Sequence, residues 1–131
     1  SYTSFLNHGH AGIVAAAPHY YSTIEANPNK GVQVVQGDWP SRFKPRVYQA
    51  GVISTSVAQD QKAAKKAASF LTKPYSLLST LTTTDTFYCS QLVYQAYRLG
   101  AGVSLPHGLP GIITPSDLLH AGATEVTYRY E

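Results

Sequence analysis

Short apolar runs bounded by turn-forming residues dominate the first part of the chain. Residues 10–16 read HAGIVAA, and after a turn at Ala17-Pro18-His19 a second strand is expected over residues 20–25. The composition of residues 27–31, NPNKG, is typical of a tight turn, and the valines within residues 32–35 indicate a third strand. Three strands with such short connections favour an antiparallel meander.

The pattern changes from strand to helix after a fourth expected strand over residues 46–53. Ser54 to Ser56 supply N-caps for a helix that runs to about Leu71, with its lysines facing water. Its inward stripe is Val57, Ala64, Ala67, Ala68 and Leu71. Residues 114–120 begin with the capping sequence TPSD of a short helix, and residues 125–130 read as an edge strand. The pattern predicts an α+β fold in which an antiparallel sheet packs against helices.

A further helix is expected within residues 86–100, TFYCSQLVYQAYRLG, which contain the only cysteine of the chain. One face at helical spacing, expected to pack inward, consists of Cys89, Leu92, Val93, Ala96 and Leu99. Candidate N-caps at residues 84–86 place the cysteine in the first turn. The positive end of the helix dipole favours the thiolate there, whereas a buried structural cysteine is the alternative.

Length and charge exclude several classes of protein. The 131 residues suffice for one domain, and no run of about 18 apolar residues exists to span a membrane. The net charge is +3, but the basic residues are scattered, and Lys62, Lys65, Lys66 and Lys73 are expected to form a solvated helix face. No nucleic-acid partner is therefore expected. A single cysteine forms no internal disulfide, so the thiol count leaves the compartment open.

A nucleophilic cysteine needs a base from elsewhere in the chain, and His10 and Glu25 are the candidates. In a hairpin centred near Pro18, residues whose numbers sum to about 35 lie opposite one another, which pairs His10 with Glu25. The carboxylate would hold the imidazole in the correct tautomer while the imidazole takes the thiol proton of Cys89. The spacing thus predicts a Cys–His–Glu triad, and an ordinary polar pair on a wet face is the alternative.

Four more residues are candidates for substrate contact: His8, Trp39, Tyr88 and Ser90. His8 lies two residues before His10 and is also an alternative base, and the aromatic rings are expected to line a substrate groove. A zinc site built from His8, His10 and either Glu25 or Cys89 is the rival use of these ligands. Because neither a second cysteine nor an HExxH pattern accompanies them, no metal or other cofactor is expected.

Five segments together resemble a known family: GHAGIV at 9–14, IEA at 24–26, GV at 31–32, FYCSQLV at 87–93 and TPSDL at 114–118. In this order they resemble the circularly permuted NlpC-type cysteine peptidases, the YiiX/YycO-like group of the papain-like fold. The resemblance implies a single permuted domain over residues 1–131, in which the His precedes the Cys. It assigns Cys89 as nucleophile, His10 as base and Glu25 as third member.

The resemblance also implies a hydrolase that acts on amide bonds, in bacterial cell-wall peptides or peptidoglycan fragments, through a thioester acyl-enzyme. A cell-wall substrate would imply a secreted or cell-envelope location. Related permuted enzymes act on lipids, so an acyltransferase or lipid hydrolase is an alternative, as is a binding module without activity. Family members usually carry a Gly-Asp-hydrophobic segment before the His strand. Because the chain begins at Ser1, an N-terminally truncated or processed form is expected.

Overall fold

A six-stranded antiparallel sheet runs through the computed structural model of the chain, which describes residues 4–7, 10–16, 22–36, 42, 47–120 and 124–130. In sequence order the strands are β1 (Ser4–Asn7), β2 (His10–Val14), β3 (Ser22–Asn27), β4 (Gly31–Gln36), β5 (Val47–Val52) and β6 (Thr124–Tyr130). In space their order is β4-β3-β2-β1-β5-β6. The predicted meander is confirmed as β2-β3-β4, and the predicted C-terminal edge strand is β6.

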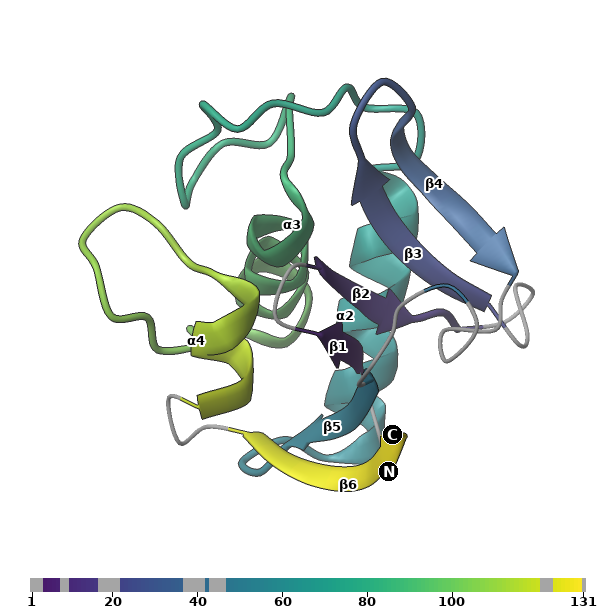
Figure 1. Cartoon of the computed structure of the whole chain (residues 1–131), viewed down its shortest axis with the longest axis vertical. Coiled ribbons are helices and arrows are strands. Elements are labelled where there is room, and N and C mark those ends of the chain that lie inside the picture. Colours follow the sequence, from purple (N-terminus) through teal and green to yellow (C-terminus); the bar gives the residue numbers. More distant parts are fainter. Residues whose placement is uncertain are drawn as a thin grey trace.

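The helices cover the sheet from one face and one side (Figure 1). They are α2 (Val57–Ser69), α3 (Cys89–Ala96), which continues into the π-helix η1 (Tyr97–Ala101), and α4 (Pro115–His120). Figure 1 shows α2 behind the strands and α3 and α4 to the left of them. In the described ranges, no helix is long and apolar enough to cross a membrane.

Strand β1 was not predicted from the sequence, although it lies in the middle of the sheet between β2 and β5. Its four residues, SFLN, are too few to show an alternating pattern of their own. Its place is secured by neighbours on both sides: Phe5 lies opposite Gly12 of β2 and opposite Gln49 of β5. Pairing with distant strands, rather than local pattern, makes this segment a strand.

The register between β2 and β3 differs from the prediction. Ile13 lies opposite Ile24. The predicted pairing of His10 with Glu25 would have placed Ile13 opposite Ser22, two residues earlier in β3. The connection is longer than the tight turn assumed, because β2 ends at Val14 and β3 begins only at Ser22. A shift of two residues leaves every side chain on its original face. His10 and Glu25 therefore stay on one face of the sheet, as diagonal neighbours.

The opposite face of β2, β3 and β4 is apolar and packs into the core. The buried residues of this face include Ala11, Ile13, Ile24, Ala26 and Val32. Strict alternation along the strands thus separates a core face from the face that carries His10 and Glu25. Helix α2 begins after Ser56, whose capping box with Gln59 matches the predicted cap. Val57, predicted to point inward, is exposed, because this first-turn residue lies beyond the buried stripe of Ala63, Ala64 and Ala67.

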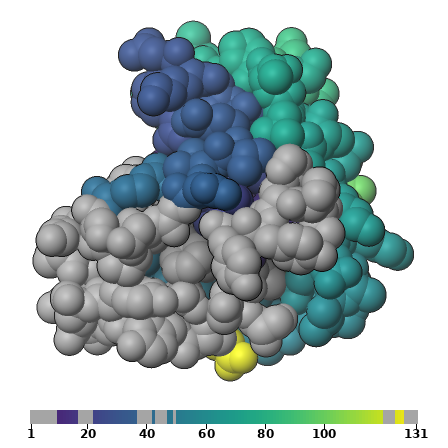
Figure 2. Space-filling view, turned by 90° about the vertical axis from the view of Figure 1, so that its right-hand side faces the viewer, coloured from purple at the N-terminus to yellow at the C-terminus, as the bar shows by residue number. Residues whose placement is uncertain are grey.

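The β3–β4 hairpin is fastened to the segment that follows α2. Backbone N–H of Val32 donates to Lys73 O at 2.8 Å, and that of Thr72 donates to Val32 O at 2.9 Å. Gly31 has φ +75°, and a Cβ there would lie 2.4 Å from Lys73 O, so only glycine allows this approach. Figure 2 shows the hairpin, in dark blue, beside the teal and green surface of this segment. The contact fixes β3, and with it Glu25.

Helix α3 is buried on every side, which the sequence pattern did not predict. The amides of Gln91 and Gln95, which lie outside the predicted inward face, are fully buried and donate to the Thr83 carbonyl at 3.0 and 2.8 Å. Leu99, expected inward, is 40% exposed. The chain changes from α to π winding at Tyr97, which rotates the following residues out of the α-helical register.

The start of α3 also differs from the prediction, which placed the N-cap within residues 84–86. Tyr88 is the N-cap, and its backbone N–H donates to Gln91 Oε1 at 3.2 Å. Cys89 is therefore the first residue of the helix, so its predicted place in the first turn is confirmed. At α4, the predicted cap is present: Asp117 N–H donates to Thr114 Oγ1, and Thr114 N–H donates to Asp117 Oδ2.

Candidate active site

The three side chains predicted to be catalytic come together at one end of the sheet. His10 opens β2, Glu25 lies within β3, and Cys89 is the first residue of α3. His10 Nε2 lies 2.8 Å from Glu25 Oε1, and the same imidazole lies close enough to the Cys89 thiol for each group to shift the pKa of the other. Because Nε2 faces the carboxylate, Nδ1 is the ring nitrogen left to exchange a proton with the sulfur. All three side chains are buried.

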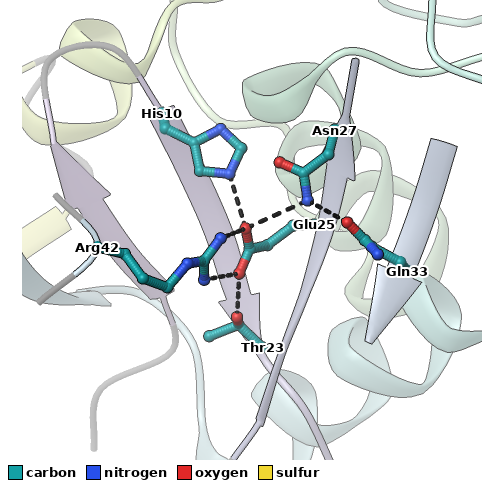
Figure 3. A network of polar contacts seen from close by, with 6 residues as sticks. All are labelled: His10, Thr23, Glu25, Asn27, Gln33 and Arg42. Carbon is teal, nitrogen blue, oxygen red and sulfur yellow. Dashed lines mark hydrogen bonds and ion pairs between the residues drawn. The ribbon is translucent and has the colours of Figure 1, made fainter. Parts of the chain in front are cut away.

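Glu25 is the centre of a polar network on this face of the sheet (Figure 3). The Arg42 guanidinium donates to both carboxylate oxygens, from Nη1 to Oε2 at 2.9 Å and from Nη2 to Oε1 at 2.9 Å. Thr23 Oγ1 donates to Oε2, and Asn27 Nδ2 lies 3.4 Å from Oε1. The bidentate ion pair with Arg42 and the neighbouring hydrogen bonds give both oxygens of this wholly buried carboxylate hydrogen-bond donors.

The network keeps Glu25 ionised. Burial alone would raise its pKa, but the hydrogen bonds from His10, Arg42 and Thr23 outweigh burial and lower the pKa from 4.5 to about 2. The stabilisation that this carboxylate gives to the fold is therefore complete above pH 4.5 and is lost as the pH falls toward 2. At neutral pH the imidazole of His10 faces a full negative charge.

Cys89 and His10 each stabilise the charged form of the other. Burial works against both charged forms, but the bond to Cys89 and the carboxylate of Glu25 raise the pKa of His10 from 6.5 to about 9. The pKa of the Cys89 thiol is lowered despite burial, by His10 and by backbone hydrogen bonds from Ala11 and Ser90. Both shifts favour a thiolate–imidazolium pair, the reactive form of a cysteine nucleophile.

The N-terminus of α3 also stabilises a negative charge on the Cys89 sulfur. By position, the backbone N–H groups of Cys89, Ser90 and Gln91 have no acceptor within the helix; the first intrahelical bond runs from Leu92 N–H to Tyr88 O at 3.0 Å. Such donors carry the positive end of the helix dipole and stabilise an anion, either the thiolate or an oxyanion that forms next to it.

Tyr88 and Ser90, two of the predicted substrate contacts, hold one wall of a groove beside Cys89. Ser90 Oγ donates to Ile113 O at 2.7 Å, and Tyr88 Oη accepts from Ile113 N–H at 3.1 Å. The groove has a volume of about 220 Å3, and both residues line it. His8 and Trp39, the other two predicted contacts, lie outside the residues that the structure describes.

Arg42 and Thr23 are site residues that sequence reasoning missed. Thr23 lies two positions before Glu25 on the same strand face, so its contact was available from strand periodicity. Nothing in the local sequence singles out Arg42, which lies 17 residues from Glu25. The one available signal was indirect: a buried carboxylate needs a cationic partner, and any arginine of the chain could have supplied it.

Residues 3–108 match the family described as permuted papain-like amidase enzymes, YaeF/YiiX, C92 family. The chain belongs to this family. The match confirms the resemblance and the permuted papain-like α+β fold expected from the sequence motifs.

Two individual proteins are similar to the chain. The uncharacterized protein YycO of Bacillus subtilis (strain 168) is 28% identical over 129 residues, which are 95% of this chain and 50% of that protein. The chain thus spans about half the length of the curated relative that it matches. The crystal structure of the metalloprotein yiiX from Escherichia coli O157:H7 matches with a TM-score of 0.81, 16% identity and coverage of 100% of this chain and 98% of that one. At that identity the likeness shows the fold.

This neighbour is called a metalloprotein, and zinc is the rival use of the predicted ligands. Within the described ranges, no group of three or more His, Cys, Asp or Glu side chains is placed to hold a metal ion. His10 gives Nε2 to Glu25, and its raised pKa favours the protonated ring, which has no lone pair for a metal. His8, the other ligand considered, lies outside those ranges. The described residues do not fit a metal centre.

Proposed function

We propose that the protein is a cysteine amidase in which Cys89 is the nucleophile, His10 the general acid and base, and Glu25 the residue that orients the imidazole. One observation carries the proposal: a thiol at a helix N-terminus lies beside an imidazole whose Nε2 is 2.8 Å from a buried carboxylate. The family, described as amidase enzymes, supports the same chemistry.

The reaction follows from the charges on these groups. The Cys89 thiolate attacks the carbonyl carbon, and the oxyanion forms next to the N–H groups of the first turn of α3. As the C–N bond breaks, the His10 imidazolium gives its proton to the leaving nitrogen, and a free amine departs from the thioester. Neutral His10 then takes a proton from water, whose oxygen attacks the thioester. A carboxylic acid leaves, and the thiolate–imidazolium pair is restored.

Cell-wall peptides or peptidoglycan fragments are the substrates that we propose, by analogy with the chemistry of NlpC-type enzymes. Such a substrate would place the protein outside the cytoplasm, in the envelope or secreted. Acyl transfer and lipid hydrolysis would use the same three residues and differ only in what resolves the thioester. The largely apolar walls of the groove beside Cys89 are compatible with a lipid acyl chain and support this second candidate substrate.

Trapping the thioester with hydroxylamine tests the proposed covalent route. During turnover of an amide, hydroxylamine should intercept the acyl-enzyme, so acyl hydroxamate is expected to form at the expense of the carboxylic acid as its concentration rises. Mass spectrometry measures both products, and incubation of the acid itself with enzyme and hydroxylamine is the control. Amide turnover that yields only acid at every hydroxylamine concentration would contradict a thioester. Parallel reactions with peptidoglycan fragments and phospholipids separate the two candidate substrate classes.

A further inference from the structure

Strand β4 forms one outer edge of the sheet, so half of its backbone groups point away from β3 (Figure 1). The segment after α2 covers the start of this edge, where Val32 N–H donates to Lys73 O and Val32 O accepts from Thr72 N–H. Backbone direction repeats every second residue, so the N–H and C=O groups of Val34 and Gln36 point the same way. No partner for these groups is found among the described residues. Such an open edge is a template for a further strand.

A pocket of about 530 Å3 lies against this open part of the edge. Four consecutive residues of β4, 33–36, line it. Because successive side chains point to opposite faces of a sheet, a pocket that contacts all four reaches the backbone of the strand. The other lining residues come from the end of β3, the following turn and the segment after β4: Asn27, Pro28, Lys30 and Arg42. The volume falls within the roughly 300 to 1,000 Å3 of pockets that hold a ligand.

The charge of this pocket is positive. Lys30 and Arg42 line it, and the described lining residues include no Asp or Glu. Arg42 is already paired with Glu25, whereas Lys30 has no carboxylate partner in the described part of the chain. Gln33 Oε1 accepts from Asn27 Nδ2 at 2.8 Å, which leaves the amide N–H groups of Gln33 available to a ligand (Figure 3). A lysine charge beside amide donors is suited to a carboxylate.

The pocket is separate from the proposed nucleophile. Neither His10 nor Cys89 is among its described lining residues. Arg42 borders both places, since it lines the pocket and donates to both oxygens of Glu25. A ligand here would therefore contact the Cys–His–Glu group through Arg42 and would bind without a reactive thiol.

We propose that the open edge of β4 and this pocket bind an extended peptide that carries a carboxylate side chain. The peptide adds to β4 as a further strand, and its backbone exchanges hydrogen bonds with Val34 and Gln36. Its carboxylate lies against Lys30 and the amide of Gln33. This binding site depends on β4 and its turn, and it does not require that Cys89 be the nucleophile.

Titration with short peptides, followed by proton–nitrogen NMR, tests the proposal. The Cys89→Ser protein is used, so that the proposed nucleophile is absent during the measurement. Each probe is a pentapeptide of alternating valine and threonine, blocked at both ends, with glutamate at its first or last position to cover both strand directions. The amide resonances of Val34 and Gln36 are expected to shift, because these N–H groups gain acceptors.

Two changes in the peptide separate its contacts. Glutamine in place of glutamate should weaken binding about three- to fivefold, the effect of losing one exposed ion pair. Methylation of alternate backbone nitrogens should weaken it by about tenfold or more when the methyl groups face β4, and little when they face away.

Three variants of the protein test the same contacts from the other side. Lys30→Gln should bring the glutamate peptide down to the affinity of the glutamine peptide. Lys65→Gln, on the exposed face of α2, is the matched control and should leave both affinities unchanged. Val34→Pro removes one outward N–H at an edge position that tolerates proline, and it should weaken both peptides; thermal unfolding checks its fold.

The outcomes that would overturn the proposal are distinct. Absence of any shift at millimolar peptide would do so, as would shifts that miss Val34 and Gln36. Equal affinities for the glutamate and glutamine peptides, with and without Lys30, would show that no carboxylate is bound here. Because the titration requires no turnover, its result is independent of whether Cys89 proves to be the nucleophile.

Discussion

Replacing Cys89 by Ser is expected to abolish amide hydrolysis, with kcat/KM lower by at least about 10³-fold. A hydroxyl has a far higher pKa than a thiol, so His10 and the first turn of α3 would no longer hold an anionic nucleophile. The change keeps the size and burial of the side chain almost intact. A steady-state assay of amide hydrolysis, with the released amine as readout, measures the loss.

Two controls make the Cys89→Ser result decisive. Thermal unfolding should show that the variant still folds, because the sulfur is buried without a disulfide partner. Ser69→Ala, on the outer surface of α2, should keep full activity, since Ser69 Oγ donates only to Lys66 O in its own helix. Amide turnover by the folded Cys89→Ser variant within tenfold of the original rate would show that the nucleophile lies elsewhere.

The second large effect is expected for Arg42→Ala. Both oxygens of Glu25 lose a charged donor, while the carboxylate stays buried with His10 and Thr23 as its close partners. Removing one side of such a pair costs about 3 kcal/mol of unfolding free energy when it is fully buried, and about 2 kcal/mol here because the arginine is partly solvent-exposed. We expect kcat/KM to fall about 10- to 100-fold, because Glu25 no longer holds the imidazole in one orientation.

The pH dependence distinguishes this positioning role from a general loss of stability. Without Arg42 the pKa of Glu25 should rise from about 2 toward 4.5, so acid unfolding should move to higher pH. Arg42→Lys keeps the charge without the fork and should restore part of both effects. Arg98→Ala removes the same charge and is the control, because the Arg98 guanidinium donates to Gln95 and not to Glu25. An Arg42→Ala variant with unchanged acid unfolding and unchanged kcat/KM would contradict the role.

The predictable part of the site follows from short-range periodicity. Two-residue alternation puts His10 on the same face as Glu25 even in the wrong register, and helical spacing puts Cys89 in the first turn even with the wrong cap. Errors of two residues along a strand, or of a few residues at a helix start, do not change these assignments. The contact between His10 and Glu25 was therefore accessible from the sequence.

The parts that the sequence did not reveal depend on contacts between distant segments. Gln91 and Gln95 look like surface residues until the connection between α2 and α3 folds over them and offers the Thr83 carbonyl. Arg42 joins Glu25 from the segment after β4, and β1 becomes a strand only between two partners. Local propensity carries no information on these pairings, since each depends on the assembled fold.

The most direct test of the central claim is a titration of the Cys89 thiolate by its ultraviolet absorbance. The chain has one cysteine and ten tyrosines, so the difference between the unmodified protein and Cys89→Ser isolates the sulfur. We expect the pKa of the Cys89 thiol to lie below the ordinary value of about 8.5, and His10→Ala to move it to that value or above it, because burial then acts unopposed by the imidazole. An ordinary thiol pKa that is the same with and without His10 would contradict the account.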